Sequence, residues 1–132
     1  QDNAGWTALH VATYYGFMPV MHVLLKENEI GLNKKNNDGY TALAIASAKG
    51  YLPIVNLLTR RRDLDLNIVD ARGRTALHLA ARKGITSVSQ ILLLRGIDHT
   101  IKDYRGQTAL ELARSMGRRS TVEEMELIIT GR

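Results

Sequence analysis

Histidine is the residue type in this chain whose chemistry most readily suggests a catalytic or metal site. There are four, His10, His22, His78 and His99, and the sequence contains no cysteine. A zinc site needs several histidine or cysteine ligands at short, characteristic spacings, and no two of these histidines have such a spacing. The serines have no local base and no nucleophile-elbow motif. The sequence therefore predicts no enzyme activity, no catalytic residue, no metal site and no cofactor.

Two of the histidines, His10 and His78, stand at equivalent places in a sequence that repeats itself. The tripeptide T-A-L occurs at residues 7–9, 41–43, 75–77 and 108–110, so the repeat has a nearly constant period. In every copy one glycine precedes the threonine by two residues and another follows it by nine. A period of 33 or 34 residues predicts a stack of similar supersecondary units, each of which buries its apolar face against the next.

Each copy has the start and stop signals of two helices. The threonine is a good N-cap residue for the first helix, and the later glycine suits its C-terminal end. A second helix then carries an apolar stripe that we expect to be buried: Val20, Val23, Leu24 and Leu25; Ile54, Leu57 and Leu58; Val88, Ile91 and Leu92; Val122, Met125 and Ile129. Phe17 and Tyr51, at equivalent positions after the glycine, are expected to pack. One extra residue before Asn33 and one before Asn67 are expected to lengthen the preceding helix.

The turn glycine, T-x-L-H, A-A-x-x-G, an I/V-x-x-L-L helix and a period of about 33 residues together resemble the ankyrin repeat. The resemblance covers four units, about 2–35, 36–69, 70–102 and 103–132. It implies an all-α fold, a single-domain ankyrin-repeat solenoid of four stacked helix-turn-helix units with hairpin-like loops. His10 and His78 match a family histidine that bonds loop backbone across repeats, whereas Ala44 and Glu111 replace it in the other two units.

The resemblance also implies where a partner would bind. In the family, the variable contact positions flank the turn glycine at the hairpin tip and include the two residues before the glycine that ends the first helix. Five of the seven aromatic residues fall on such positions, and aromatic and arginine side chains are the usual anchors of an interface. The predicted partner-binding residues are Trp6, Tyr14, Tyr15, Tyr40, Lys49, Arg72, Arg74, Arg82, Lys83, Tyr104 and Arg105.

Charge is concentrated in the third unit. The chain has a formal net charge of +5, and residues 70–102 account for +4 of it. Four of the six cations of this unit, Arg72, Arg74, Arg82 and Lys83, stand at predicted binding positions and are expected to be dispensable for the fold. We therefore expect a protein-interaction module whose partner is a protein or peptide surface with apolar and acidic features.

Three other functions remain open. Cations interleaved with Tyr40 and Tyr104 could bind phosphate groups and stack on bases, although nucleic-acid binding is the less favoured interpretation of so modest a charge. The rings of Trp6, Tyr14, Tyr15 and Tyr40 could form a cage for a methylated ammonium, as in methyl-lysine recognition. The chain could also be a structural spacer within a larger protein.

Composition limits the surroundings in which we expect the chain to work. The sequence is 45% hydrophobic and 23% charged, as in ordinary globular domains. No apolar run is long enough to span a bilayer, and the absence of cysteine favours an intracellular location, cytoplasmic or nuclear. The first motif begins at once without an initiator methionine, so we expect a piece excised from a longer protein. As an isolated domain it is expected to be a monomer.

Overall fold

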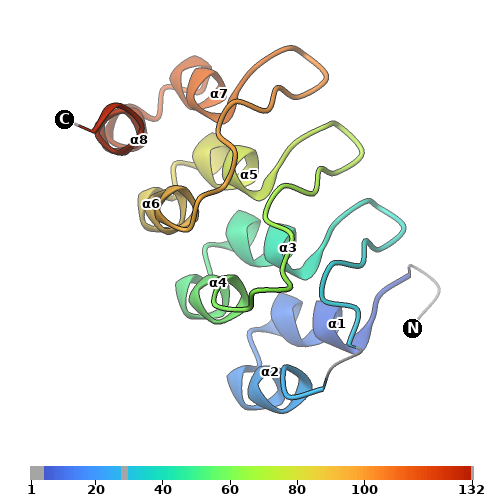
Figure 1. Cartoon of the computed structure of the whole chain (residues 1–132). Coiled ribbons are helices and arrows are strands. Elements are labelled where there is room, and N and C mark those ends of the chain that lie inside the picture. Colours follow the sequence, from blue (N-terminus) through green and yellow to red (C-terminus); the bar gives the residue numbers. More distant parts are fainter. Residues whose placement is uncertain (1–4, 28–29, 132) are drawn as a thin grey trace.

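The helices of the chain are arranged in two layers, as a computed structural model that describes residues 5–27 and 30–131 shows. The inner layer consists of α1 (Ala8–Tyr15), α3 (Ala42–Lys49), α5 (Ala76–Lys83) and α7 (Ala109–Ser115). The outer layer consists of α2 (Met18–Leu24), α4 (Leu52–Thr59), α6 (Thr86–Leu94) and α8 (Arg119–Thr130). Long loops project to one side of the inner helices, and the units succeed one another along the stack (Figure 1). The described residues form no strand, so the predicted all-α solenoid is confirmed.

The inner helices begin at the predicted threonines. Each of these residues is an N-cap whose hydroxyl accepts a hydrogen bond from the backbone N–H three residues later, as Thr75 does from His78 at 3.3 Å. Helices α1, α3 and α5 end at Gly16, Gly50 and Gly84, each in the left-handed conformation. α7 ends one residue earlier than the pattern predicts, with Met116 as its C-cap.

Buried side chains at the base of the second, third and fourth hairpins fix the shape of their tips. The Oδ1 atom of Asp70 accepts hydrogen bonds from the backbone N–H groups of Arg72 and Arg74, both at 2.9 Å. Asn36 and Asp103 make the same pair of bonds in the second and fourth units. Because these oxygens satisfy backbone donors that would otherwise be left unpaired, the tips keep one geometry from unit to unit.

The core lies between the two layers and continues through the stack. Small residues on the inner helices, such as Ala46 and Ala80, are buried and allow neighbouring units to pack closely, while larger side chains such as Leu77 and Leu92 fill the space between the layers. α1 contacts α3, α3 contacts α5 and α5 contacts α7, so each inner helix packs against the next.

Two expectations for the outer helices are wrong. In α2 the side chains of Val20 and Val23 are exposed, and Met21 is the buried residue of this helix. The extra residues before Asn33 and Asn67 do not lengthen helices: α6, whose unit lacks an extra residue, has nine residues, against eight in α4. In the second unit the additional length is taken up by the loop that follows α4.

Candidate partner-binding face

The first part of the predicted site is a small apolar pocket between the first two units, here called the aromatic pocket. It has a volume of about 230 Å³. Trp6 and Tyr40 reach it from the ends of two successive hairpins, while Tyr14 and Lys49 reach it from the last turns of α1 and α3. The complete lining is Trp6, Tyr14, Asp38, Tyr40, Ala44, Ile45, Ala48 and Lys49.

The side chains of the aromatic pocket pack on one another. The rings of Trp6 and Tyr14 meet edge to face with their centroids 5.4 Å apart, an arrangement that aromatic pairs prefer. The Lys49 ammonium lies over the ring of Tyr14, with Nζ 4.0 Å from the ring centroid. This distance is within the range of a cation–π interaction. The face of Tyr14 therefore already holds a cation of the chain itself.

Tyr15 lies outside this pocket. Its ring packs edge to face against Tyr14, 5.1 Å between centroids, and stacks on Phe17 at 5.7 Å. The expectation that Phe17 packs is met only by this contact with Tyr15, since its side chain is exposed, whereas Tyr51 packs against the core. The four-ring cage proposed from the sequence is therefore not assembled, because Tyr15 is absent from the lining and Tyr14 is covered by Lys49.

The second part of the site is a larger and more polar pocket between the third and fourth units, here called the arginine pocket. It has a volume of about 600 Å³. The side chains of Arg72, Arg82 and Arg105 are exposed, and the Tyr104 ring packs over Gly73 while remaining 76% exposed. The complete lining is Arg72, Arg74, Arg82, Asp103, Tyr104, Arg105, Gln107, Leu112, Ser115 and Met116. Lys83 is exposed but lines neither pocket.

Arg74 differs from its neighbours because its charge is already paired. Its Nε lies 3.0 Å from Oδ2 of Asp70, and the side chain is only 11% exposed. Its Nη2 donates a hydrogen bond of 3.4 Å to the hydroxyl of Tyr40. The expectation that Arg74 is dispensable for the fold is therefore wrong, since it ties its own hairpin to the preceding one. The same contact joins the linings of the two pockets.

At each pocket, a histidine of the preceding unit supports one hairpin by a hydrogen bond. Nε2 of His10 lies 2.9 Å from the backbone oxygen of Tyr40, and Nε2 of His78 lies 2.9 Å from that of Gln107. In both rings Nδ1 accepts the N–H of the N-cap threonine, Thr7 or Thr75. Nε2 therefore carries the proton that is donated to the next hairpin. Both histidines are structural, as the sequence predicts.

The sequence prediction missed the floors of the pockets. Ala44 and Ile45 of α3 lie beneath the aromatic pocket, and Leu112 of α7 lies beneath the arginine pocket. The sequence does place these residues near the start of an inner helix. An apolar residue at such a position is more simply interpreted as part of the core than as part of a binding surface. Within residues 5–27 and 30–131, no three histidine, aspartate or glutamate side chains are grouped as a metal site would require. In the same residues, no helix has the length and apolar character needed to cross a membrane.

Comparison with known families agrees with this architecture. The family model described as ankyrin repeats (3 copies) matches residues 1–70 and 61–125. The chain therefore belongs to the ankyrin-repeat family. Proteins of this family are generally protein-interaction modules and are typically not enzymes. A search of individual curated proteins found no match.

Proposed function

We propose that this domain binds an extended segment of a partner protein along its hairpin tips and the concave face of its inner helices. The observation that carries the proposal is the hydrogen bond between Arg74 and Tyr40, which joins the linings of the aromatic and arginine pockets. An extended ligand that follows the hairpins can therefore occupy both pockets, because their linings adjoin at this contact.

The chemistry of the two pockets defines the partner. The aromatic pocket offers ring faces together with Ala44 and Ala48, which suits an apolar anchor side chain. The arginine pocket presents three exposed guanidinium groups, because only Arg74 is paired with a carboxylate there. The carboxylate of Asp103 faces backbone N–H groups instead. The proposed partner segment therefore has an apolar residue at one end and acidic residues at the other.

The rigidity of the hairpins supports this function. Side-chain oxygens of Asp70 and Asp103 hold the tips from within, and His10 and His78 hold two of them from the preceding unit. A surface already fixed in its binding geometry loses little conformational freedom on association, which favours affinity for a short segment.

The test is a selection from a displayed library of random peptides. We expect enriched peptides to combine an aromatic or aliphatic residue with a group of acidic residues. The double variant Arg72→Glu and Arg82→Glu is expected to weaken binding of a selected peptide by at least about tenfold, with an unchanged melting curve. The matched control is Arg60→Glu and Arg62→Glu, which makes the same change in charge at two exposed positions after α4. Selected peptides that bind the Arg72/Arg82 variant normally would refute the proposed face.

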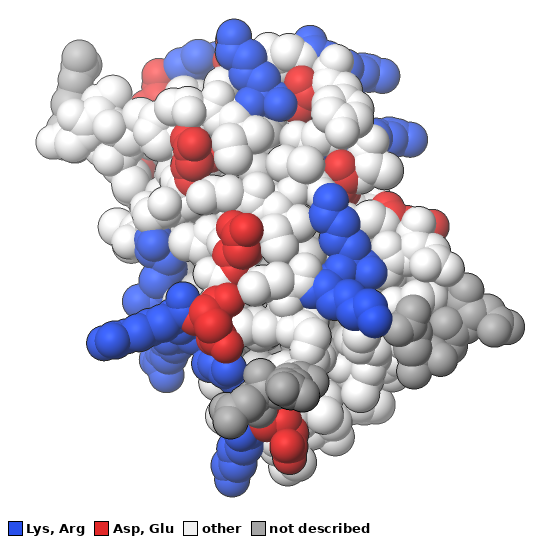
Figure 2. Space-filling model, turned by 45° about the vertical axis from the view of Figure 1, so that its right-hand side comes forward, with Lys and Arg blue, Asp and Glu red and all other residues white. Residues whose placement is uncertain are grey.

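Nucleic-acid binding is the weaker alternative. On the surface drawn in Figure 2, Lys and Arg side chains form separate groups with Asp and Glu between them, not a continuous basic band. A backbone-tracking site for single strands needs such a band. Titration with single-stranded oligonucleotides at low salt tests this, and an affinity that falls steeply with added salt would favour the alternative.

A further inference from the structure

The first unit exposes an apolar surface on the side that faces away from the second unit. Its large side chains are Val11 of α1, Val20 and Val23 of α2, and Phe17 between the two helices, with exposed fractions of 38%, 45%, 62% and 52%. Ala8, at the start of α1, is exposed beside them in sequence. A group of exposed apolar residues at one place indicates an interaction surface more often than single exposed residues do.

The repeat shows what normally becomes of these positions. Because the units recur with a nearly constant period, every exposed residue of the first unit has three equivalents further along the chain. The equivalents of Ala8, Val11 and Val20 are all buried: Ala42, Ala76 and Ala109; Ile45, Leu79 and Leu112; Ile54, Val88 and Thr121. The equivalents of Val23 and Phe17 in the second and third units are half-buried and pack against the core. Exposure of apolar side chains at these positions is therefore a property of the first unit alone.

Contacts that cover later equivalents of Phe17, Val20 and Val23 come from the preceding unit. Equivalents of Phe17 pack over the glycine that ends the preceding inner helix: Tyr51 over Gly16, Ile85 over Gly50 and Arg118 over Gly84. Thr121, the equivalent of Val20, shares a hydrogen bond of 2.8 Å with Thr86 of the third unit. Glu124, the equivalent of Val23, accepts a hydrogen bond of 3.0 Å from Gln90 of that unit. These contacts belong to the interfaces between successive units of the stack.

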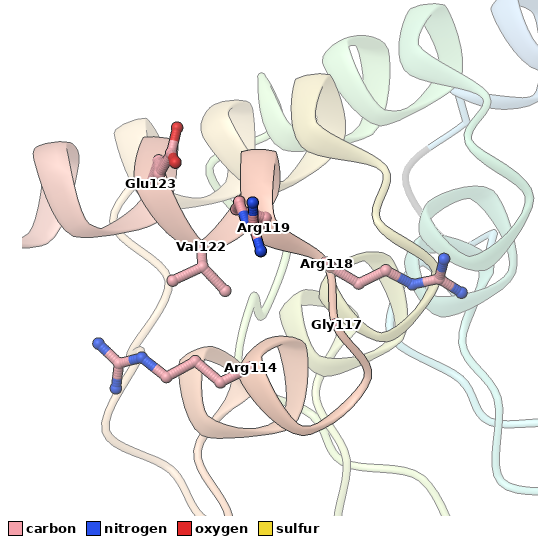
Figure 3. A pocket seen from close by; sticks show the side chains of 6 residues that line it. All are labelled: Arg114, Gly117, Arg118, Arg119, Val122 and Glu123. Atoms are coloured by element: carbon pink, nitrogen blue, oxygen red, sulfur yellow. The ribbon is translucent and has the colours of Figure 1, made fainter.

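The fourth unit differs from the first, because charged side chains lie on its outer side. Arg114 stands where the preceding units bury Thr13, Ser47 and Ala81, and its guanidinium pairs with Glu126 at 2.6 Å. Figure 3 shows Arg114 on α7 and Arg119, Val122 and Glu123 on α8 around an open pocket, with Arg118 directed away from them. Charged side chains in this place suit a surface in contact with water.

We propose that the surface formed by Val11, Phe17, Val20 and Val23 is the seat of one further ankyrin-type helix pair, placed before α1 in the stack. A helix pair of this kind is what covers the equivalent residues in the other three units, and its terminal glycine would lie beneath Phe17 as Gly50 lies beneath Ile85. The match is close for the second unit, because the residues it covers in the third unit, Leu79, Ile85, Val88 and Ile91, correspond to these four. This proposal is independent of the proposed function.

The test adds such a unit to the intact chain. A copy of residues 36–69 is joined directly before residue 2, so that the junction reproduces the one between Val69 and Asp70. We expect the melting temperature to rise by at least about 5 °C, because a repeat stack gains stability from each apolar interface between neighbours. The double variant Val20→Lys and Val23→Lys should remove this rise in the extended protein, while leaving the melting temperature of the original chain nearly unchanged.

Two results would overturn the proposal. The first is a melting temperature that does not rise on extension, or that rises equally in the Val20/Val23 variant, since the added unit would then not be seated on this surface. The second is a dimer of the original chain in sedimentation velocity that the two lysines convert to a monomer. That result would assign the surface to a second copy of the chain.

Discussion

The aromatic pocket and the arginine pocket are built on the same frame of hairpins and inner helices, but their side chains are held in different ways. In the aromatic pocket the predicted binding residues pack on one another, with Trp6 against Tyr14 and the Lys49 ammonium over the Tyr14 ring. In the arginine pocket Arg72, Arg82 and Arg105 extend into solvent. The geometry beneath them is kept by Asp70 and Asp103, which bind backbone N–H groups.

Because of this difference, substitutions in the two pockets are expected to affect the stability of the fold differently. Trp6 and Lys49 both pack on Tyr14, so substitution of any of these three residues is expected to change the pocket and the fold together. An exposed arginine has no such partner, and its substitution changes the charge of the surface while the hairpin keeps its shape. Arg74 is the exception in the arginine pocket, because its side chain has partners within the protein, Asp70 and the hydroxyl of Tyr40.

The largest expected effect is on the support of the arginine pocket. Asp70→Ala removes the acceptor of two backbone N–H groups and leaves the mostly buried Arg74 without its carboxylate. Unsatisfied donors and an unpaired charge at this depth should lower the free energy of unfolding by about 2–4 kcal/mol, measured by urea denaturation. The matched comparison is Arg72→Ala, two residues away, which should change it by less than about 0.5 kcal/mol. Equal stability of the two variants would contradict the distinction between support and binding groups.

A smaller effect is expected from the cation of the aromatic pocket. Lys49→Met keeps an unbranched side chain but removes the ammonium from the Tyr14 ring. The cation–π interaction is worth about 0.5–1 kcal/mol at a partly exposed site, so the variant should be less stable by about that amount. The emission of Trp6, the only tryptophan in the sequence, should change as well, because Tyr14 packs against its ring.

Lys83→Met is the control for this prediction. Lys83 is the equivalent of Lys49 in the next unit, since each directly precedes the glycine that ends its inner helix, but it lines neither pocket. Its substitution should leave both the stability and the Trp6 emission unchanged. If the two variants behave alike, the ring contact of Lys49 contributes nothing to the aromatic pocket.

The comparison also shows which features the sequence could predict. Thr75 and Gly84 predict the bounds of α5 correctly, because a cap and a left-handed glycine act within a few residues of chain. The bonds that His10 and His78 make to the next hairpin were predicted from the family resemblance, because no local signal contains them. The four-unit fold was therefore predictable from local signals that recur.

The errors at Val20 and Arg74 concern contacts between units. Val20 follows the apolar pattern of its helix, but it is exposed because a residue at this position is buried only by a preceding unit. Arg72 and Arg74 are the same residue type on one hairpin, yet only Arg74 reaches both Asp70 and the hydroxyl of Tyr40 in the unit before it. A pattern within one unit contains no information about these contacts. The assignment of the two pockets to a partner stays a prediction.

The smallest expected effect distinguishes the floors of the two pockets by their response to acid. α7 begins with a capping box in which the side chain of Glu111 accepts the backbone N–H of Thr108 at 2.9 Å. In α3, beneath the aromatic pocket, the equivalent residue is Ala44, which has no carboxylate to accept the N–H of Thr41. The hydrogen bond from the backbone N–H of Thr108, together with the one between the Thr108 and Glu111 side chains, holds the pKa of Glu111 below its usual value.

A carboxylate with a lowered pKa stabilises the fold above the pKa it has in the unfolded chain, and this contribution is lost as the pH falls through the lower folded value. Acidification from pH 6 toward about pH 3 should therefore speed amide hydrogen exchange in the first turn of α7 more than in that of α3. Glu111→Gln keeps an acceptor for Thr108 without a titrating charge, so it should remove the extra acid sensitivity of α7. If α7 in this variant still loosens more steeply with acid than α3, the ionisation of Glu111 is not what distinguishes the floors of the two pockets.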